Sequence, residues 1–162
     1  MYFKQADVLA GLDKAFIAKM MEVGAKSTYT EGTMLFDQGD TARRFYILVK
    51  GRVRLSFGDQ RNSDYTVDHG GEAFGWSSLI GSDRYTAAAR CVAPSTLIAF
   101  ERDDMEALLG GDPENAIRFY KNLTLTLGNR LLRISSQLAD HLSAADNISY
   151  GTGQVQERAE VD

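Results

Sequence analysis

The chain has 162 residues, of which 44% are hydrophobic and 25% are charged, and its formal net charge is −4. This composition is typical of one soluble globular domain, and the negative charge argues against direct nucleic-acid binding. The single cysteine excludes an internal disulfide and a cysteine-based zinc site. Because no apolar run reaches the roughly 20 residues of a membrane span, we expect a cytoplasmic protein without membrane contacts.

The first two-thirds of the chain change from helical to strand-like patterns. Residues 8–23 carry apolar side chains at helical spacing, which predicts an amphipathic helix, or a helix pair broken near Gly11. From about 26 to about 100, short β-rich runs separated by glycines predict an antiparallel roll, sandwich or barrel. The runs 45–49 and 52–56 flank Lys50-Gly51 and predict a hairpin.

The last part of the chain returns to a helical pattern. We expect a short helix over 102–109 and a long helix over about 113–144, with Pro113 in its first turn. The long helix has two adjoining apolar stripes, although one would be enough for docking against the roll. Either a homodimer forms through this helix, or its own domain wraps it more fully. We predict one domain over 1–144, and a polar, disordered tail over 145–162.

One stretch, residues 74–90, could carry chemistry. A helix that starts after Gly75 would present backbone N–H groups of Trp76, Ser77 and Ser78, together with the positive end of the helix dipole, to an anion such as phosphate. The alternative is that these serines only cap the helix.

Four segments, in order, carry a resemblance to a known family: LAGL at 9–12, EGTMLFDQGD at 31–40, FYILVKGRVRLS at 45–56 and GGEAFG at 70–75. They are similar to the cyclic-nucleotide-binding domain family, and an ordered series is far more specific than one glycine motif. The resemblance implies an α+β fold, in which an antiparallel β-roll or jelly roll over about 26–100 is flanked by an N-terminal helix and a long C-terminal helix. It implies turn roles for the glycines at 32, 39 and 51, and a structural role for Glu72.

The resemblance also shows where this sequence departs from its family. In the family, a glutamate holds the ribose 2′-hydroxyl and an arginine clamps the cyclic phosphate, but Trp76 and Tyr85 stand at these two positions. Arg84, one place away, could clamp a phosphate if it still lies in the turn. Strand alternation instead points Arg84 to solvent and places Tyr85, with Ala87, Ala89 and Cys91, on a buried face. Trp76 and Tyr85 then either stack on a planar ligand or fill the cavity.

Two further residues are candidates for ligand contacts. Thr86 matches a position where the family often has a small hydroxyl residue near the phosphate or base, although an ordinary strand threonine needs no such role. Arg130 on the long helix contacts the ligand or lies on a solvated face.

The first functional hypothesis is a stand-alone ligand-sensing regulatory domain with a small-molecule effector, cAMP or cGMP by kinship, and no required cofactor. The alternative is a ligand-free dimeric module that binds an unidentified partner protein. A transcription regulator would need a helix-turn-helix module, for which the polar tail is too short, so DNA would be reached only through a partner. The residues suggest neither an enzyme nor a metal site, because no catalytic set or ligand spacing occurs around His69 and Cys91.

Overall fold

The computed structural model describes residues 7–58 and 64–141. The chain divides into two compact units, Met1–Leu127 and Gly128–Asp162, and each is considered by itself. The proposed tail over 145–162 lies outside the described residues, and the domain limits stay a prediction. Among the described residues, no helix combines the length and the apolar character that crossing a membrane requires.

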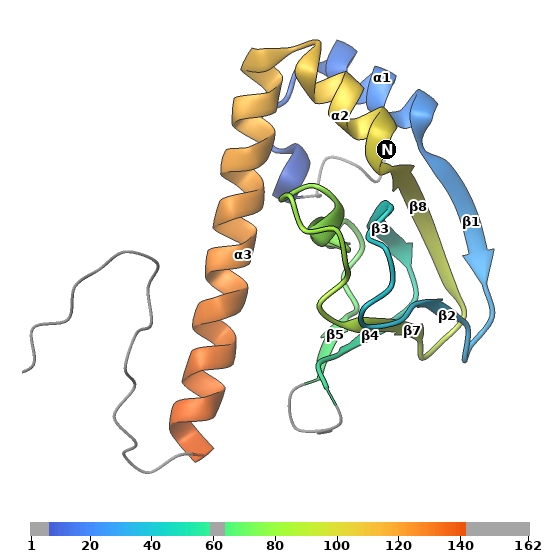
Figure 1. Ribbon diagram of the computed structural model, residues 1–162, viewed down its shortest axis with the longest axis vertical. Coiled ribbons are helices and arrows are strands. Elements are labelled where there is room, and N and C mark those ends of the chain that lie inside the picture. Colours follow the sequence, from blue (N-terminus) through green and yellow to red (C-terminus); the bar gives the residue numbers. More distant parts are fainter. Residues whose placement is uncertain (1–6, 59–63, 142–162) are drawn as a thin grey trace, which may run out of the picture. The chain divides into compact units, whose positions relative to one another are not determined.

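Helices flank a set of eight strands (Figure 1). A 3₁₀ turn over Asp7–Leu9 precedes α1, and Gly11 between them has a φ of 70°, which confirms a helix pair broken near this glycine. The helices are α1 (Lys14–Val23), α2 (Arg102–Gly110) and α3 (Pro113–His141). The strands are β1 (Ala25–Tyr29), β2 (Met34–Phe36), β3 (Arg44–Lys50), β4 (Val53–Ser56), β5 (Tyr65–Val67), β6 (Ala73–Phe74), β7 (Ala88–Cys91) and β8 (Ser95–Glu101).

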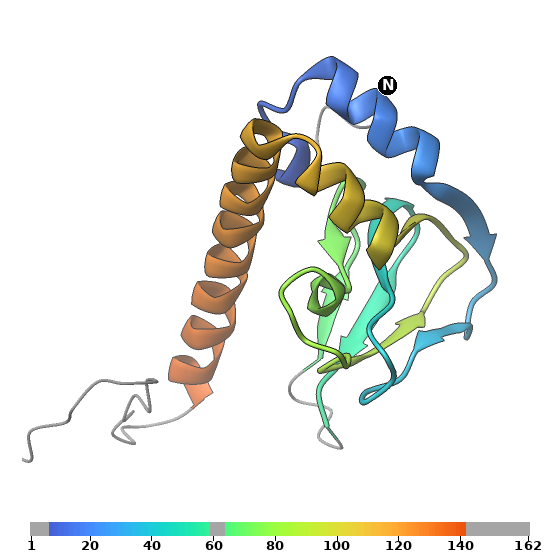
Figure 2. The same ribbon diagram turned by 45° about the horizontal axis from the view of Figure 1, so that its top comes forward.

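The strands form two four-stranded antiparallel sheets that together make the roll (Figure 2). The strand orders are β1-β8-β3-β6 and β2-β7-β4-β5. This arrangement confirms the predicted α+β fold, with an N-terminal helix, an antiparallel β-roll and a long C-terminal helix.

The predicted hairpin over 45–56 is wrong. β3 pairs with β8 and β6, whereas β4 pairs with β5 and β7 in the other sheet. The chain turns a corner at Gly51, whose φ is 112° and where an added Cβ would lie 2.4 Å from Ser95 Oγ. The N–H of Arg52 donates to the same Ser95 Oγ at 3.0 Å. Contact with this serine therefore holds β4 in the second sheet.

Two hydrophobic cores lie on opposite faces of the sheet that contains β3. Phe45 and Ile47 join a helix-side core with Phe16 and Phe119, whereas Tyr46 belongs to the core inside the roll. Because successive strand residues point to opposite faces, β3 serves both cores.

A polar network anchors the start of α3 to the residue before α1. Asn115 is 2% exposed, and its Nδ2 donates to Asp13 at 3.1 Å and to Asp112 at 2.8 Å. Hydrogen bonds from the Asn115 side chain and backbone N–H lower the pKa of Asp112. The first half of α3 then adds Phe119 and Leu123 to the helix-side core.

Candidate functional site

The turn after β6 follows the predicted course but is shorter than an α-helix. Gly75 has a φ of 74°, and a Cβ there would lie 2.9 Å from the carbonyl oxygen of Arg44. The following segment, Trp76–Ser78, is a single 3₁₀ turn. Both the N–H and the Oγ of Ser78 donate to the Gly75 carbonyl, at 3.3 Å and 3.0 Å, while Ser77 is buried. The turn itself therefore engages the Ser78 N–H, and anion binding by the backbone groups of Trp76, Ser77 and Ser78 stays a prediction.

Tyr85 lies inside the roll, as the alternation predicted. Its side chain is buried, its hydroxyl donates to the carbonyl oxygen of Arg44 at 2.8 Å, and the same hydroxyl accepts the N–H of Arg44 at 2.9 Å. Burial raises the pKa of the phenol, and its backbone hydrogen bonds oppose that shift in part. The hydroxyl therefore stays neutral at physiological pH and serves as a partner for the start of β3.

The ring of Tyr85 stacks on Phe36, with 3.6 Å between ring centroids and 13° between planes. Phe36 also contacts Tyr46 and Phe74, which stack on each other with centroids 5.1 Å apart. We call Phe36, Tyr46, Phe74 and Tyr85 the aromatic cluster. The cavity beside it measures only about 40 Å³, which is room for a few water molecules. The rings of the aromatic cluster thus lie in the core inside the roll, next to this small cavity.

Trp76 and Thr86 lie at the rim of this cavity. Both line it, together with Gly75 and Ser77, but Trp76 is half-buried and also packs against the helix-side core. Thr86 is exposed. Of the two aromatic residues expected to line or fill the space, Tyr85 occupies the interior and Trp76 the boundary between the cores. Ligand contacts by any of these residues stay a prediction.

Arg84 is exposed, and its Nη1 donates to the carbonyl oxygen of Gly39 at 2.7 Å. Arg84 forms a bridge with Thr41 before β7 begins, and it is not among the residues that line the small cavity. The alternation of exposure from 84 to 91 confirms the predicted parity. A role for Arg84 as a phosphate clamp stays a prediction, and so does the role of Arg130, which lies on α3 in the unit that begins at Gly128.

The structural residues of the resemblance have the expected geometry. Gly32, Gly39 and Gly51 all have positive φ. The Glu72 carboxylate accepts hydrogen bonds from the Tyr65 hydroxyl and from backbone N–H groups in the turn before it, at 2.9 to 3.1 Å. This confirms a structural role for Glu72.

A family profile of the cyclic nucleotide-binding domain matches residues 26–112, which is 87 of the 162 residues. The chain belongs to the cyclic nucleotide-binding domain family. The match begins one residue after β1 starts and ends between α2 and α3, so it includes the roll except for the first residue of β1.

Named relatives of this domain include transcriptional regulators. The CRP-like cAMP-activated global transcriptional regulator of Mycobacterium tuberculosis is 23% identical over 138 residues, covering 84% of this chain and 60% of the relative. The cyclic AMP receptor protein of Thermus thermophilus is 32% identical over 128 residues, covering 75% and 56%. The crystal structure of the Thermus thermophilus catabolite activator protein superposes with a TM-score of 0.65 at 28% identity, covering 82% and 61%. The chain thus spans little more than half the length of these relatives.

Within this cyclic nucleotide-binding domain, sequence reasoning missed two partners of Tyr85. Phe36 lies 49 positions earlier (85 − 36 = 49) and supplies the ring on which Tyr85 stacks. Arg44 supplies backbone groups, which no residue type reveals. The alternation of β2 could have marked Phe36 as inward-facing, but not its stacking. The site therefore consists of stacked aromatic rings inside the roll, and the turn at Gly75 lines the same small cavity.

Proposed function

We propose that this domain is a regulatory interaction module whose roll is filled by its own aromatic cluster instead of a cyclic nucleotide. The Tyr85 ring carries this proposal, because it stacks on Phe36 and its hydroxyl uses both backbone groups of Arg44. The cavity beside this cluster, of about 40 Å³, is far below the roughly 300 to 1,000 Å³ of small-molecule pockets.

A second candidate is a ligand-sensing domain that binds an effector in place of the Tyr85 ring. The glycine turn at Gly75 favours it, since its positive φ and the lack of room for a Cβ beside the Arg44 carbonyl keep the backbone of this turn close to β3. Family relatives named as cAMP-activated make cAMP or cGMP the first effectors to test. Ligand contacts would shift the population of a roll that opens at Tyr85.

Isothermal titration calorimetry with cAMP and cGMP distinguishes the two candidates. We expect no heat of binding for the natural chain, and measurable binding for the double variant Trp76→Glu and Tyr85→Arg. A glutamate and an arginine at these positions would supply the family's ribose and phosphate partners, and arginine is a bidentate partner for phosphate. Tight binding of either nucleotide by the natural chain would contradict the filled-roll proposal.

The double variant needs a control for its charge and its fold. Thr30→Glu and Ser27→Arg add the same two opposite charges at exposed positions outside the small cavity, so this matched pair should leave the calorimetric trace of the natural chain unchanged. Circular dichroism checks that the Trp76→Glu and Tyr85→Arg variant remains folded. If it folds and binds neither nucleotide, the placement of Trp76 and Tyr85 in the family's signature positions is contradicted.

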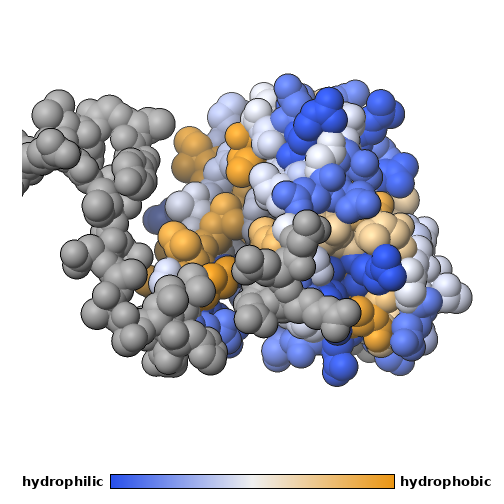
Figure 3. Space-filling model, turned by 60° about the horizontal axis from the view of Figure 1, so that its bottom comes forward, coloured by the Kyte–Doolittle hydropathy of each residue, from blue (hydrophilic) through white to orange (hydrophobic). Residues whose placement is uncertain are grey.

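We further propose that α3 pairs with α3 of a second copy. Several large apolar side chains on it are exposed, and three of them are Ile117 at 70%, Leu125 at 59% and Leu132 at 69%. Their spacing of 8 and 7 residues places them along one side of an α-helix. Figure 3 shows several groups of apolar side chains, coloured orange, on the face that it presents. A two-fold helix pair would bury such a stripe.

We expect the doubly substituted variant Leu125→Glu and Leu132→Glu to change a dimer into a monomer. Carboxylates placed in a helix pair repel each other and lose the burial of leucine, which is worth about 1.5 to 3 kcal/mol per side chain. Sedimentation velocity gives the mass of the assembly. Gln137→Glu, an exposed position on the opposite side of the helix, is the control and should remain dimeric. A monomeric natural chain would contradict this part of the proposal.

A further inference from the structure

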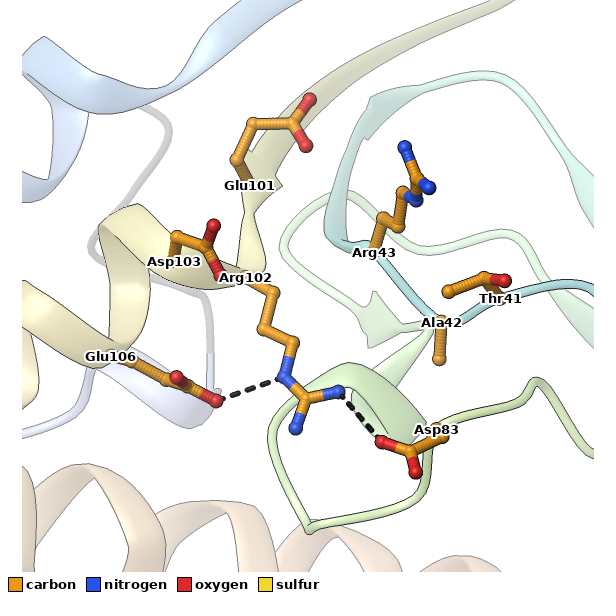
Figure 4. A pocket seen from close by; sticks show the side chains of 8 residues that line it. All are labelled: Thr41, Ala42, Arg43, Asp83, Glu101, Arg102, Asp103 and Glu106. Atoms are coloured by element: carbon orange, nitrogen blue, oxygen red, sulfur yellow. Dashed lines mark hydrogen bonds and ion pairs between the residues drawn. The ribbon is translucent and has the colours of Figure 1, made fainter.

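A second and larger cavity lies outside the roll (Figure 4). Three segments meet there: the chain leading into β3, the loop after the 3₁₀ turn Trp76–Ser78, and the start of α2. Its volume of about 510 Å³ falls within the range of small-molecule sites, unlike the cavity beside Tyr85. We call it the charged cleft. It is lined by Thr41, Ala42, Arg43, Asp83, Glu101, Arg102, Asp103 and Glu106.

Arg102 engages two of the four carboxylates that line the charged cleft. Its Nε lies 2.9 Å from Glu106 and its Nη1 lies 3.4 Å from Asp83, so it joins α2 to the loop after the 3₁₀ turn (Figure 4). A third carboxylate, Glu101, forms an ion pair with Arg44. These ion pairs engage three of the four lining carboxylates with two guanidiniums, which leaves one negative charge among them.

Arg43 and Asp103 are the lining charges that remain. Both are exposed, and among the described residues neither side chain makes a hydrogen bond or an ion pair. They stand on different walls: Arg43 directly before β3, and Asp103 in the first turn of α2. The cleft therefore presents one unused cation and one unused carboxylate.

We propose that the charged cleft binds a small zwitterion, such as a free amino acid or a short peptide. The ligand carboxylate would pair with the Arg43 guanidinium, and its ammonium group with the Asp103 carboxylate. Four carboxylates against two guanidiniums make the lining net negative, which disfavours nucleotides and simple anions. Arg43 in turn disfavours ligands that carry only positive charge.

A ligand there would hold together three segments that already share backbone hydrogen bonds. The N–H of Ala42 donates to the Asp83 carbonyl at 2.9 Å, and the N–H of Arg102 donates to the Arg43 carbonyl at 2.7 Å. The N–H of Tyr85 donates to the Asp40 carbonyl at 2.9 Å, which links these walls to the roll. Occupation of the charged cleft would therefore stiffen the loop beside the aromatic cluster.

Nuclear magnetic resonance titration of the ¹⁵N-labelled full chain tests the site. The probes are glycine, L-leucine and glycylglycine, each added at fixed pH and ionic strength, with sodium acetate and methylammonium chloride as single-charge controls. We expect saturable amide shifts at 41–43, 83 and 101–106 with at least one zwitterion at millimolar concentration, and smaller, unsaturated shifts with either control.

Two variants and a matched control locate the binding. Arg43→Gln and Asp103→Asn should each weaken the binding about tenfold, which is a typical loss for one charge-assisted contact. Asp104→Asn removes the neighbouring carboxylate, which does not line the cleft, and should leave the binding unchanged. Amide shifts elsewhere report whether each variant keeps its fold. The proposal is overturned if no zwitterion gives saturable shifts, if acetate or methylammonium acts equally well, or if Asp104→Asn weakens binding as much.

Discussion

Replacement of Tyr85 by alanine is expected to lower the free energy of unfolding by about 3 to 5 kcal/mol, the range for large aromatic side chains removed from a core. The change removes the ring that stacks on Phe36 and the hydroxyl that satisfies both backbone groups of Arg44. Urea denaturation followed by circular dichroism measures this loss.

Tyr85→Phe separates the contribution of the hydroxyl from that of the ring. It keeps the stacking but leaves the N–H and C=O of Arg44 without their partner, so we expect a loss of about 1 to 3 kcal/mol. Tyr120→Phe on α3 is the control, since Tyr120 is 38% exposed, and we expect a change within about 0.5 kcal/mol. If Tyr85→Ala lowers the free energy of unfolding by less than the loss expected for Tyr85→Phe, the stability of the roll does not depend on the Tyr85 side chain.

Gly51→Ala is expected to destabilise the protein by about 3 kcal/mol or more, because two costs add at one position. The φ of 112° is one that side chains rarely adopt, and an added Cβ would lie 2.5 Å from the Ser95 Cα and 2.6 Å from the Pro94 carbonyl oxygen. Backbone atoms cannot rotate away as a side chain does. The corner between β3 and β4 would therefore have to open, and thermal unfolding would show the loss.

Gly32→Ala is the matched control for this substitution. Gly32 also has a positive φ, 87°, but a Cβ there would meet no atom within 4 Å. Gly32→Ala should therefore lower the free energy of unfolding only by the conformational strain, about 1 to 2 kcal/mol. Equal losses at the two glycines would show that the contact with Ser95 and Pro94 does not fix the corner.

The sequence predicted those features of the fold that depend on local periodicity. Strand alternation alone placed Tyr85 inward and Arg84 outward, because a two-residue repeat needs no knowledge of distant segments. The hairpin failed for the opposite reason. The pattern around Gly51 is compatible both with a hairpin and with a corner, and Ser95, which lies 43 residues from its partner Arg52, decides between them.

The site could be predicted only in part, for a related reason. The sequence shows that Tyr85 stands at the position of the family's arginine. It does not show that the distant ring of Phe36 stacks on Tyr85. The charged cleft gave no signal at all, because its walls come from three separate segments, 41–43, 83 and 101–106, and each contains ordinary surface charges. Only the folded chain shows that Arg102 occupies two of these carboxylates while Asp103 stays available.

The position of Trp76 gives the chain a built-in optical reporter. It is the only tryptophan, it packs against the helix-side core, and it lines the small cavity beside Tyr85. The wavelength and intensity of its fluorescence emission therefore respond to rearrangement on either side of the sheet. Quenching experiments on the unmodified chain can follow opening of the roll and loosening of the helices without an attached dye.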